Sequence, residues 1–330
     1  MPDPRLDGFQ VPDEHLIEGQ DDNIEQFFVV VCSNVSGIGP ATAGAIAVDF
    51  EHDLQAFLQA DKERFARIKK TSGAPLLREA QIDDLLTAKE PIPKGRPIEE
   101  AWVFYLGRKF LQEQAIMVEG LSLDNFDINP LLAKALTLDT PGKVIAFNVY
   151  QTVTRSVVTS WGNAVETMAK YSGCKDNDVA IEGQTGTNFD LIKSLGETDY
   201  YIQVKSGPNT MNVGMVTSLN RAIERIERDR DNVEGILGMT YGKRERISNQ
   251  ITANLRDADT KMKIGREFWD FISERENYHK VLFSLLEASS SGILSESFID
   301  LIENKIIELV EQWEAKSPSG SIDDMLENYI

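Results

Sequence analysis

The chain has 330 residues, of which 42% are hydrophobic, and its 53 acidic and 34 basic side chains give a formal charge of −19. This apolar share can build one large or two ordinary cores, which excludes a wholly disordered chain. No apolar run approaches the ~18 residues of a membrane helix, and the acidic N-terminus lacks the order of a secretory signal. Two cysteines and three histidines leave no zinc cluster and no disulfide framework, so a cytoplasmic protein without a membrane partner is expected.

Much of the negative charge lies at the two ends of the chain. Residues 1–26 hold eight acids and one base, and residues 293–330 hold nine acids and two bases, so each end carries −7. The residues between them therefore carry only −5. Because phosphate affinity depends on the local placement of Lys and Arg, the total charge neither supports nor excludes a DNA partner.

Composition along the chain predicts four segments. Residues 1–22 are rich in Pro, Asp and Gly without periodicity, which predicts a flexible acidic arm. Helical patterning dominates 23–92, and the Pro/Gly-rich stretch 91–97 is the best boundary between two domains. Helices and a short strand-rich centre follow over 98–316, and 317–330 form an acidic tail that opens a final short helix.

The first sharp motif is the glycine turn Gly37-Ile-Gly39, which leads into a helix with Pro40 in its first turn. Glycines let backbone N–H groups approach a phosphate closely, and the helix N-terminus adds a partial positive charge. The segment resembles the helix-hairpin-helix motif, which holds a DNA backbone phosphate without reading bases. The resemblance implies DNA contacts at Gly37, Gly39 and Thr42, and an apolar stripe continues the helical pattern through Phe50, Leu54, Phe57, Leu58, Phe65 and Ile68.

A second, weaker hairpin is predicted at 69–73, with Leu85-Leu86 beyond it. Residues 61–71 hold five bases and two acids, a local charge of +3 beside the proposed phosphate site. Lys69 and Lys70 are therefore further candidates for DNA contact.

Two other interpretations of the glycine turn stay open. A strand at 27–32 leading into the turn would be typical of a dinucleotide site, but Thr42 replaces the third glycine and no strand ending in an acid follows. The turn is otherwise a glycine-rich helix start that binds no ligand.

The centre of the chain predicts a pair of strands, at 187–192 and 200–206, separated by a turn-rich loop at 193–199. Antiparallel pairing would bring Asp190 close to Gln203 and Lys205, which project from the same face of the sheet. The Asp190 carboxylate can hold a hard divalent cation, and Lys205 can orient water and balance phosphate charge. Charged side chains also alternate with apolar ones in ordinary surface hairpins, so the pair alone does not establish a site.

A predicted helix over 161–170 precedes these strands and carries Glu166. A second carboxylate at the same sheet edge would suit a Mg²⁺ site that keeps several waters. The alternative is an ordinary solvated acid on a helix surface.

This order of a helix acid, Asp190, and Gln203-Val-Lys205 resembles the PD-(D/E)xK nucleases, and within them the type II restriction endonucleases. The resemblance covers roughly 100–290 and extends to four further segments, 127–136, 155–162, 203–212 and 265–271. It implies that Asp190 binds the metal, Gln203 fills the (D/E) position, Lys205 is catalytic and Glu166 is the helix acid. Two positions depart from the pattern: Phe189 replaces proline, and Gln203 supplies an amide oxygen where a carboxylate is usual, which makes Glu166 more important. Asp199 is the alternative acid.

The resemblance also implies a fold and a reaction. The fold would be α/β, a restriction-endonuclease-like core with a mixed central sheet flanked by helices, preceded by a small all-α helix-hairpin-helix domain. The reaction would be Mg²⁺-dependent hydrolysis of double-stranded DNA at a short sequence, within a restriction-modification system, by a homodimer that leaves 5′-phosphate ends. Two alternatives are a DNA-binding or repair-associated protein whose nuclease centre has decayed at Gln203, and a nucleotide-dependent enzyme that uses Gly37 and Gly39.

Polar residues beside the predicted strands are further candidates for DNA contact. Asn209, Thr210 and Asn212 can read bases or phosphates, or they can cap the helix that runs to about 230. Lys243 and Arg244 begin a short run with a net charge of +2, whose alternative is a solvated surface. A buried strand is predicted over 233–241, and an amphipathic helix over 298–313.

Overall fold

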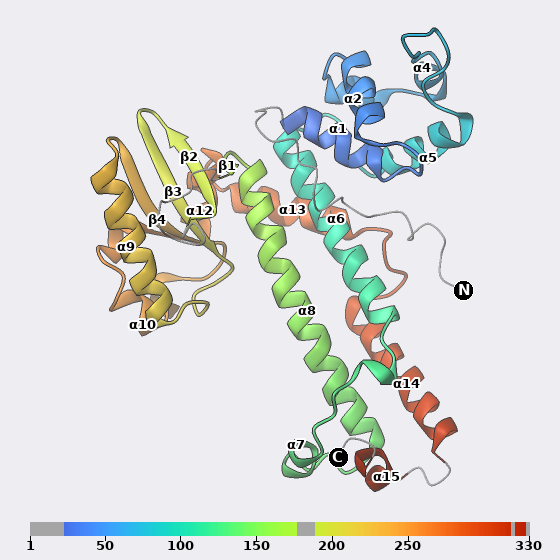
Figure 1. The fold of residues 1–330 in the computed structure, drawn as a ribbon, viewed down its shortest axis with the longest axis vertical. Coiled ribbons are helices and arrows are strands. Elements are labelled where there is room, and N and C mark those ends of the chain that lie inside the picture. The colour runs from blue at the N-terminus through green and yellow to red at the C-terminus, as the bar shows by residue number, and fades with distance from the viewer. Residues whose placement is uncertain (1–22, 177–188, 318–320, 328–330) are drawn as a thin grey trace. The chain divides into compact units, whose positions relative to one another are not determined.

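A computed structural model describes residues 23–176, 189–317 and 321–327, so the arm expected at 1–22 lies outside the described residues. Contacts between backbone positions divide the chain into two compact units. The first contains residues up to Gly107 together with Ala164–Ser289, and the second contains Arg108–Asn163 together with Ser290–Ile330. Helices α6 (Ile98–Glu119) and α8 (Pro141–Tyr171), drawn in turquoise and green in Figure 1, contribute residues to both units. Among the described residues, no helix is long and apolar enough to cross a membrane.

The first unit begins with five helices: α1 (Asn23–Ser33), α2 (Pro40–Asp49), α3 (Leu54–Gln59), α4 (Lys62–Ala66) and α5 (Glu79–Lys89). Asp53 and Asp61 cap α3 and α4 by accepting backbone N–H bonds, which explains the helix breaks in the apolar stripe. All six residues of that stripe are buried, as predicted, and the rings of Phe28, Phe50, Phe57 and Phe65 pack together. The strand considered at 27–32 is wrong, because α1 occupies those residues.

A mixed sheet forms the centre of the first unit. Its five strands among the described residues are β1 (Lys175–Asp176), β2 (Leu191–Leu195), β3 (Thr198–Lys205), β4 (Val233–Met239) and β5 (Met262–Ile264). They lie in the order β1-β2-β3-β4-β5, with antiparallel pairs up to β3 and parallel pairs from β3 to β5. The predicted mixed sheet and the predicted antiparallel pairing of β2 with β3 are therefore confirmed.

The hairpin between β2 and β3 is tighter than the sequence suggested. A loop over 193–199 was expected, but β2 extends to Leu195 and β3 begins at Thr198. Only Gly196 and Glu197 lie between the strands, and Gly196 has a φ of 63°. Glycine at the first position of a two-residue turn permits this geometry, so β2 runs past the predicted end at 192 and β3 begins before the predicted start at 200.

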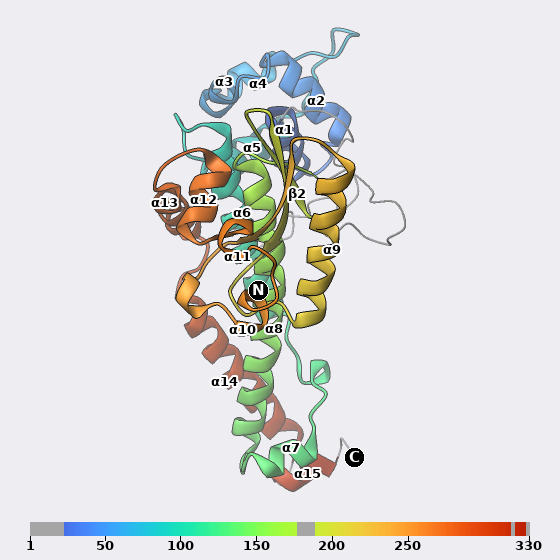
Figure 2. The same ribbon diagram turned by 90° about the vertical axis from the view of Figure 1, so that its left-hand side faces the viewer.

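Helices cover both faces of the sheet. The crossover helix α9 (Val213–Asp229) connects β3 to β4 and lies along the sheet in both views (Figures 1 and 2). A Cβ atom at Gly235 would lie 2.6 Å from Ile223 of α9, and one at Gly238 would lie 2.4 Å from Phe268 of α12 (Arg266–Ser273). Because residues 235 and 238 of β4 face opposite sides, these glycines let one helix approach each face closely.

The remaining elements are helical. The first unit also contains η2 (Arg244–Arg246), α10 (Asn249–Thr252), α11 (Ala258–Lys261) and most of α13 (Tyr278–Ser290). The second unit contains η1 (Leu123–Asn125), α7 (Pro130–Ala135), α14 (Phe298–Lys316) and α15 (Ile322–Glu327), besides its parts of α6 and α8. The predicted helices at 161–170 and 298–313 are thus confirmed, and the first is part of a much longer helix. The residues between α5 and α6 are irregular, as expected, while the domain limits at 92 and 98 stay a prediction.

Candidate active site and nucleic-acid interface

Asp190 lies directly before β2 and is fixed against β3 by two hydrogen bonds. Its backbone N–H donates to the Ile202 carbonyl over 2.8 Å, and its carboxylate accepts from the Val204 N–H over 2.7 Å. The second bond places the carboxylate beside Val204, which lies between Gln203 and Lys205 in β3. The strand register therefore brings together the three groups that the sequence analysis singled out.

The electrostatic surroundings of Asp190 pull in two directions. Partial burial of the carboxylate raises its pKa above the ordinary value, while the Val204 N–H and the positive charge of Lys205 act in the opposite direction. The net direction is upward, so the Val204 hydrogen bond and the charge of Lys205 do not fully offset the cost of burying the ionised carboxylate. A cation bound beside it would stabilise the charged form.

Gln203 and Lys205 share one face of β3, as their spacing predicted, and both side chains are half-buried. Their partners across the parallel pair are Leu237 and Met239 of β4, which are fully buried. The amide and the ammonium group thus lie at the border of an apolar layer. Such a border strengthens electrostatic interactions with a bound phosphate.

The donor set suits a divalent cation that keeps part of its water shell. Asp190 has one carboxylate oxygen on Val204 and a second oxygen to offer, and Gln203 adds an amide oxygen. Among residues 23–176, 189–317 and 321–327, no three His, Cys, Asp or Glu side chains cluster as metal ligands. Mg²⁺ is commonly held by one or two carboxylates and several waters, so this sparse set is compatible with it.

Glu166 lies half-buried on α8, five residues before that helix ends. Its role as a second metal ligand stays a prediction. The alternative acid Asp199 lies at the start of β3, where it accepts a 2.6 Å hydrogen bond from Ser194. Six residues of extended strand, about 20 Å, separate Asp199 from Lys205, so Asp199 does not belong to the same cluster.

The segment after β3 folds tightly over the end of β4. A Cβ atom at Gly207 would lie 2.4 Å from the exposed ring of Tyr241, so a larger residue there would displace that ring. The Thr210 hydroxyl donates to the Gly207 carbonyl, and the Asn212 side chain caps α9 by accepting from the Met215 N–H. The capping alternative for Asn212 is therefore confirmed.

A pocket of about 470 Å³ lies beside this segment and contains several predicted contact residues. It is lined by Pro208, Asn209, Thr210, Tyr241, Gly242, Lys243 and Arg246. Arg246 ends the basic run that begins at Lys243, whereas Tyr241, expected inside a buried strand, is 57% exposed and was missed as a site residue. The parallel pairing of β3 with β4 explains its position, because the carboxyl ends of parallel strands lie at the same end of a sheet.

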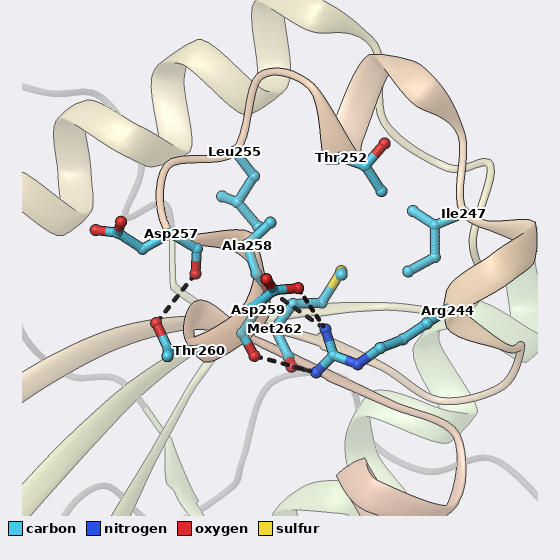
Figure 3. A pocket seen from close by; sticks show the side chains of 9 residues that line it. All are labelled: Arg244, Ile247, Thr252, Leu255, Asp257, Ala258, Asp259, Thr260 and Met262. Atoms are coloured by element: carbon cyan, nitrogen blue, oxygen red, sulfur yellow. Dashed lines mark hydrogen bonds and ion pairs between the residues drawn. The ribbon is translucent and has the colours of Figure 1, made fainter.

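Arg244 points away from that surface. Its guanidinium donates to the carbonyls of Met262, Asp259 and Ala258 and pairs with Glu267 at 3.1 Å. Figure 3 shows the side chain in a pocket of about 480 Å³, reaching towards the backbone of Asp259 and Met262. Arg244 thus holds the segment that leads into β5 through these hydrogen bonds.

The glycine turn lies between α1 and α2, as predicted. Gly37 has a φ of 78°, and its carbonyl accepts a 3.0 Å hydrogen bond from the buried Gln81 side chain of α5. Gly39 precedes α2, with no side-chain cap on that helix and open space around it, and Thr42 is half-buried in the first turn. The turn is therefore held by a side chain of α5, while the N-terminus of α2 is accessible.

Lys69 and Lys70 lie exposed in the connection between α4 and α5. Lys69 pairs with Pro75 in an isolated antiparallel bridge, and Gly73 has a φ of 83°. The expected second hairpin is thus a short β-like loop, and its two lysines face solvent.

The comparison with protein families gives one decisive result. The family model described as type II restriction endonuclease EcoO109I matches residues 106–291, which is more than half of the chain. The chain belongs to this restriction endonuclease family. The search of curated proteins gave no significant match.

Family membership makes the protein a nuclease that acts on DNA, and its mixed sheet flanked by helices is the core of that fold. Glu166, Asp190, Gln203 and Lys205 all fall within the part of the endonuclease that the family model matches. The glycine turn and the two exposed lysines of the N-terminal helices fall outside it, so their likeness to a helix-hairpin-helix module stays a prediction.

Proposed function

We propose that this endonuclease hydrolyses double-stranded DNA at a short specific sequence with Mg²⁺ as cofactor, within a cytoplasmic restriction-modification system. The observation that supports the proposal best is the hydrogen bond between the Asp190 carboxylate and the Val204 N–H, between Gln203 and Lys205. A carboxylate, an amide and an ammonium group gathered at the end of the central strand β3 are the groups that phosphodiester hydrolysis needs.

Each residue has a distinct role in the proposal. Asp190, Gln203 and Glu166 would hold Mg²⁺, which when bound supplies positive charge for the scissile phosphate and lowers the pKa of a coordinated water. Lys205 positions the attacking water and stabilises negative charge on the phosphate oxygens as the P–O bond breaks. The buried layer formed by Leu237 and Met239 limits competing water.

The same proposal assigns contacts with the DNA backbone. Asn209, Thr210 and Lys243 line the pocket beside the sheet end and would contact phosphates or bases. Gly37, Gly39 and Thr42, with Lys69 and Lys70, would hold a second stretch of backbone. The side chains of Asn212 and Arg244 are already hydrogen-bonded within the fold. A homodimer would place one such centre on each DNA strand.

A second function is favoured by one observation, the neutral amide at Gln203 with no cluster of three acids among the described residues. A DNA-binding protein with a decayed nuclease centre would show the same feature. Such a protein would bind duplex DNA without cutting it, and Gln203→Glu would restore cleavage.

Digestion of mixed genomic DNA, followed by sequencing of the ends, tests the two functions together. The proposed endonuclease yields a discrete set of 5′-phosphate ends in Mg²⁺ and none in EDTA. DNA that stays whole in Mg²⁺ while the protein retains duplex binding would favour the decayed centre. The substrate DNA should contain every possible short recognition sequence, so that uncut DNA cannot be explained by a missing site.

A further inference from the structure

Helix α8 contains a long segment without acidic residues. The chain has 53 Asp and Glu side chains, yet residues 140–165 contain none and include Lys143 and Arg155. This segment lies within the part that the endonuclease family model matches. In a protein with a formal charge of −19, it is a place where a polyanion meets no repulsion from the helix itself.

Polar residues follow one face of this segment. They are spaced three and four residues apart, which places them in a single stripe along a helix. The stripe consists of Asn148, Gln151, Thr152, Arg155, Ser156, Thr159 and Ser160. Val149 and Val153 lie on the side of the helix opposite Gln151 and Arg155 and are buried in the core of the second unit. The helix is therefore anchored by its apolar face and presents hydrogen-bonding groups on the other.

The stripe forms one wall of a pocket of about 560 Å³ within the second unit. The other lining residues are Asn125, Phe126 and Asp127 from the segment around η1. Among the described residues that line it, Phe126 is the only apolar side chain and Asp127 the only acid. This composition differs from a small-molecule pocket or a protein interface, which are centred on apolar and aromatic residues.

Several stripe residues offer unused hydrogen-bonding groups. Gln151, Arg155 and Thr159 are exposed, and none of their side chains takes part in the hydrogen bonds or ion pairs seen within residues 23–176, 189–317 and 321–327. Asn148 is secured by donating its amide to the Val144 carbonyl, and Ser156 donates to Gln114. The stripe thus combines oriented side chains with accessible donors and acceptors.

These side-chain types are those that read base edges in duplex DNA. Arginine pairs with two guanine acceptors, glutamine and asparagine with adenine, aspartate with the cytosine amino group, and hydroxyls with several bases. An α-helix fits the major groove, where these patterns are distinguishable. A surface that only neutralised phosphates would need several Lys or Arg residues, whereas Arg155 is the single cation of the stripe.

We propose that this polar stripe of α8 is the base-reading surface of the endonuclease, with Gln151 and Arg155 as its principal specificity residues. The proposal rests on the proposed cleavage of duplex DNA and names the substrate feature that the enzyme recognises. The stripe and Glu166 belong to one continuous helix, Pro141–Tyr171, shown in green in Figure 1.

Selection of bound duplexes from a random-sequence library tests the surface without requiring cleavage. The wild type, Gln151→Ala, Arg155→Ala and Arg155→Lys are compared in Ca²⁺ and in EDTA, with the bound sequences read out. Thr154→Ala is the matched control, because Thr154 is exposed on α8 but does not line the pocket. Thermal unfolding of each variant checks that the fold is kept.

We expect the wild type and Thr154→Ala to select the same short sequence. Gln151→Ala and Arg155→Ala should lose preference at one or two base pairs, with about ten- to hundredfold weaker binding to the selected site and unchanged binding to unrelated DNA. Arg155→Lys should show the same relaxation, because lysine keeps the charge but loses the two-bond fork.

Two outcomes would overturn the proposal while leaving the cleavage function intact. One is an unchanged selected sequence in all three stripe variants, and the other is a wild type that cuts DNA but selects no sequence. A wild type that neither binds nor cuts duplex DNA would instead overturn the proposed function and the reading surface together.

Discussion

The sheet end at Asp190 and the glycine turn at Gly37 are two candidate phosphate sites built in different ways. At the sheet end, strand register fixes the polar groups, since the Asp190 carboxylate bonds to the Val204 N–H between the two other side chains. At the glycine turn, a side chain from a distant helix fixes the backbone, since Gln81 bonds to the Gly37 carbonyl. The first site presents side chains that can take part in the cleavage reaction, and the second presents only a helix N-terminus that can position a DNA phosphate.

The largest effect is expected at Lys205, which distinguishes chemistry from positioning. Lys205→Ala should lower the single-turnover cleavage rate by about 10²–10³-fold or more, because it removes a charge aimed at the reacting phosphate. Lys243→Ala is the contrasting variant and should weaken binding and reduce its salt dependence, with little change in the rate once DNA is bound. Equal loss of rate in both variants would show that Lys205 acts only in binding.

Gln203→Glu sharpens the assignment of the metal ligands. A carboxylate in place of the amide should tighten divalent-cation binding several-fold, because a second anionic oxygen faces the cation. The check is a calorimetric titration with Mg²⁺ at fixed pH, and wild-type protein provides the reference. Unchanged affinity would place Gln203 outside the metal site.

Two substitutions at the glycine turn separate its folding role from DNA contact. Gly37→Ala should lower the free energy of unfolding by about 1–2 kcal/mol, because alanine is strained at a φ of 78°. Gly39→Ala has ordinary backbone angles and open space, so it should leave the melting temperature unchanged. If the turn holds a phosphate, Gly39→Ala should still weaken duplex binding several-fold, measured by fluorescence anisotropy. Unaltered affinity would leave the turn with a folding role alone.

The smallest effect on DNA cleavage is expected from Lys89, which is buried among the N-terminal helices and donates to the Leu58 carbonyl. Burial, with a smaller contribution from the charge of Lys94, lowers its pKa from the ordinary 10.5 to about 8. The unfolded chain therefore holds more protons than the folded one between pH 8 and 10.5, so stability should rise with pH in that window.

The matched variant for this prediction is Lys89→Met. The difference in unfolding free energy between wild type and variant should shift in favour of the wild type from pH 8 to 10.5 and stay constant below pH 8. Chemical unfolding at several pH values measures it. A difference that does not depend on pH would mean that Lys89 is solvated like a surface lysine.

The two-residue alternation of side chains in a strand and the pairing of two neighbouring β-prone runs made the sheet end predictable from the sequence. Gln203 and Lys205 had to share a face, and the β-prone runs had to pair, whatever the rest of the chain does. The exact hairpin did not follow, because a single positive φ at Gly196 allowed both strands to continue into the expected loop. Partners across long sequence separations, such as Gln81 on Gly37 or Arg244 on Met262, have no local signature. Tyr241 was missed for the same reason, since strand order brings it to the pocket beside the sheet end.

The central claim is that the acid at 190 serves the cleavage centre while the acid at 199 does not. The most direct test compares Asp190→Ala with Asp199→Ala in Mg²⁺, on duplex DNA that the wild type cuts, with rate and binding measured together. We predict that Asp190→Ala binds DNA but loses cleavage, whereas Asp199→Ala cleaves at nearly the wild-type rate. Full activity of Asp190→Ala, with its fold intact, would contradict the account.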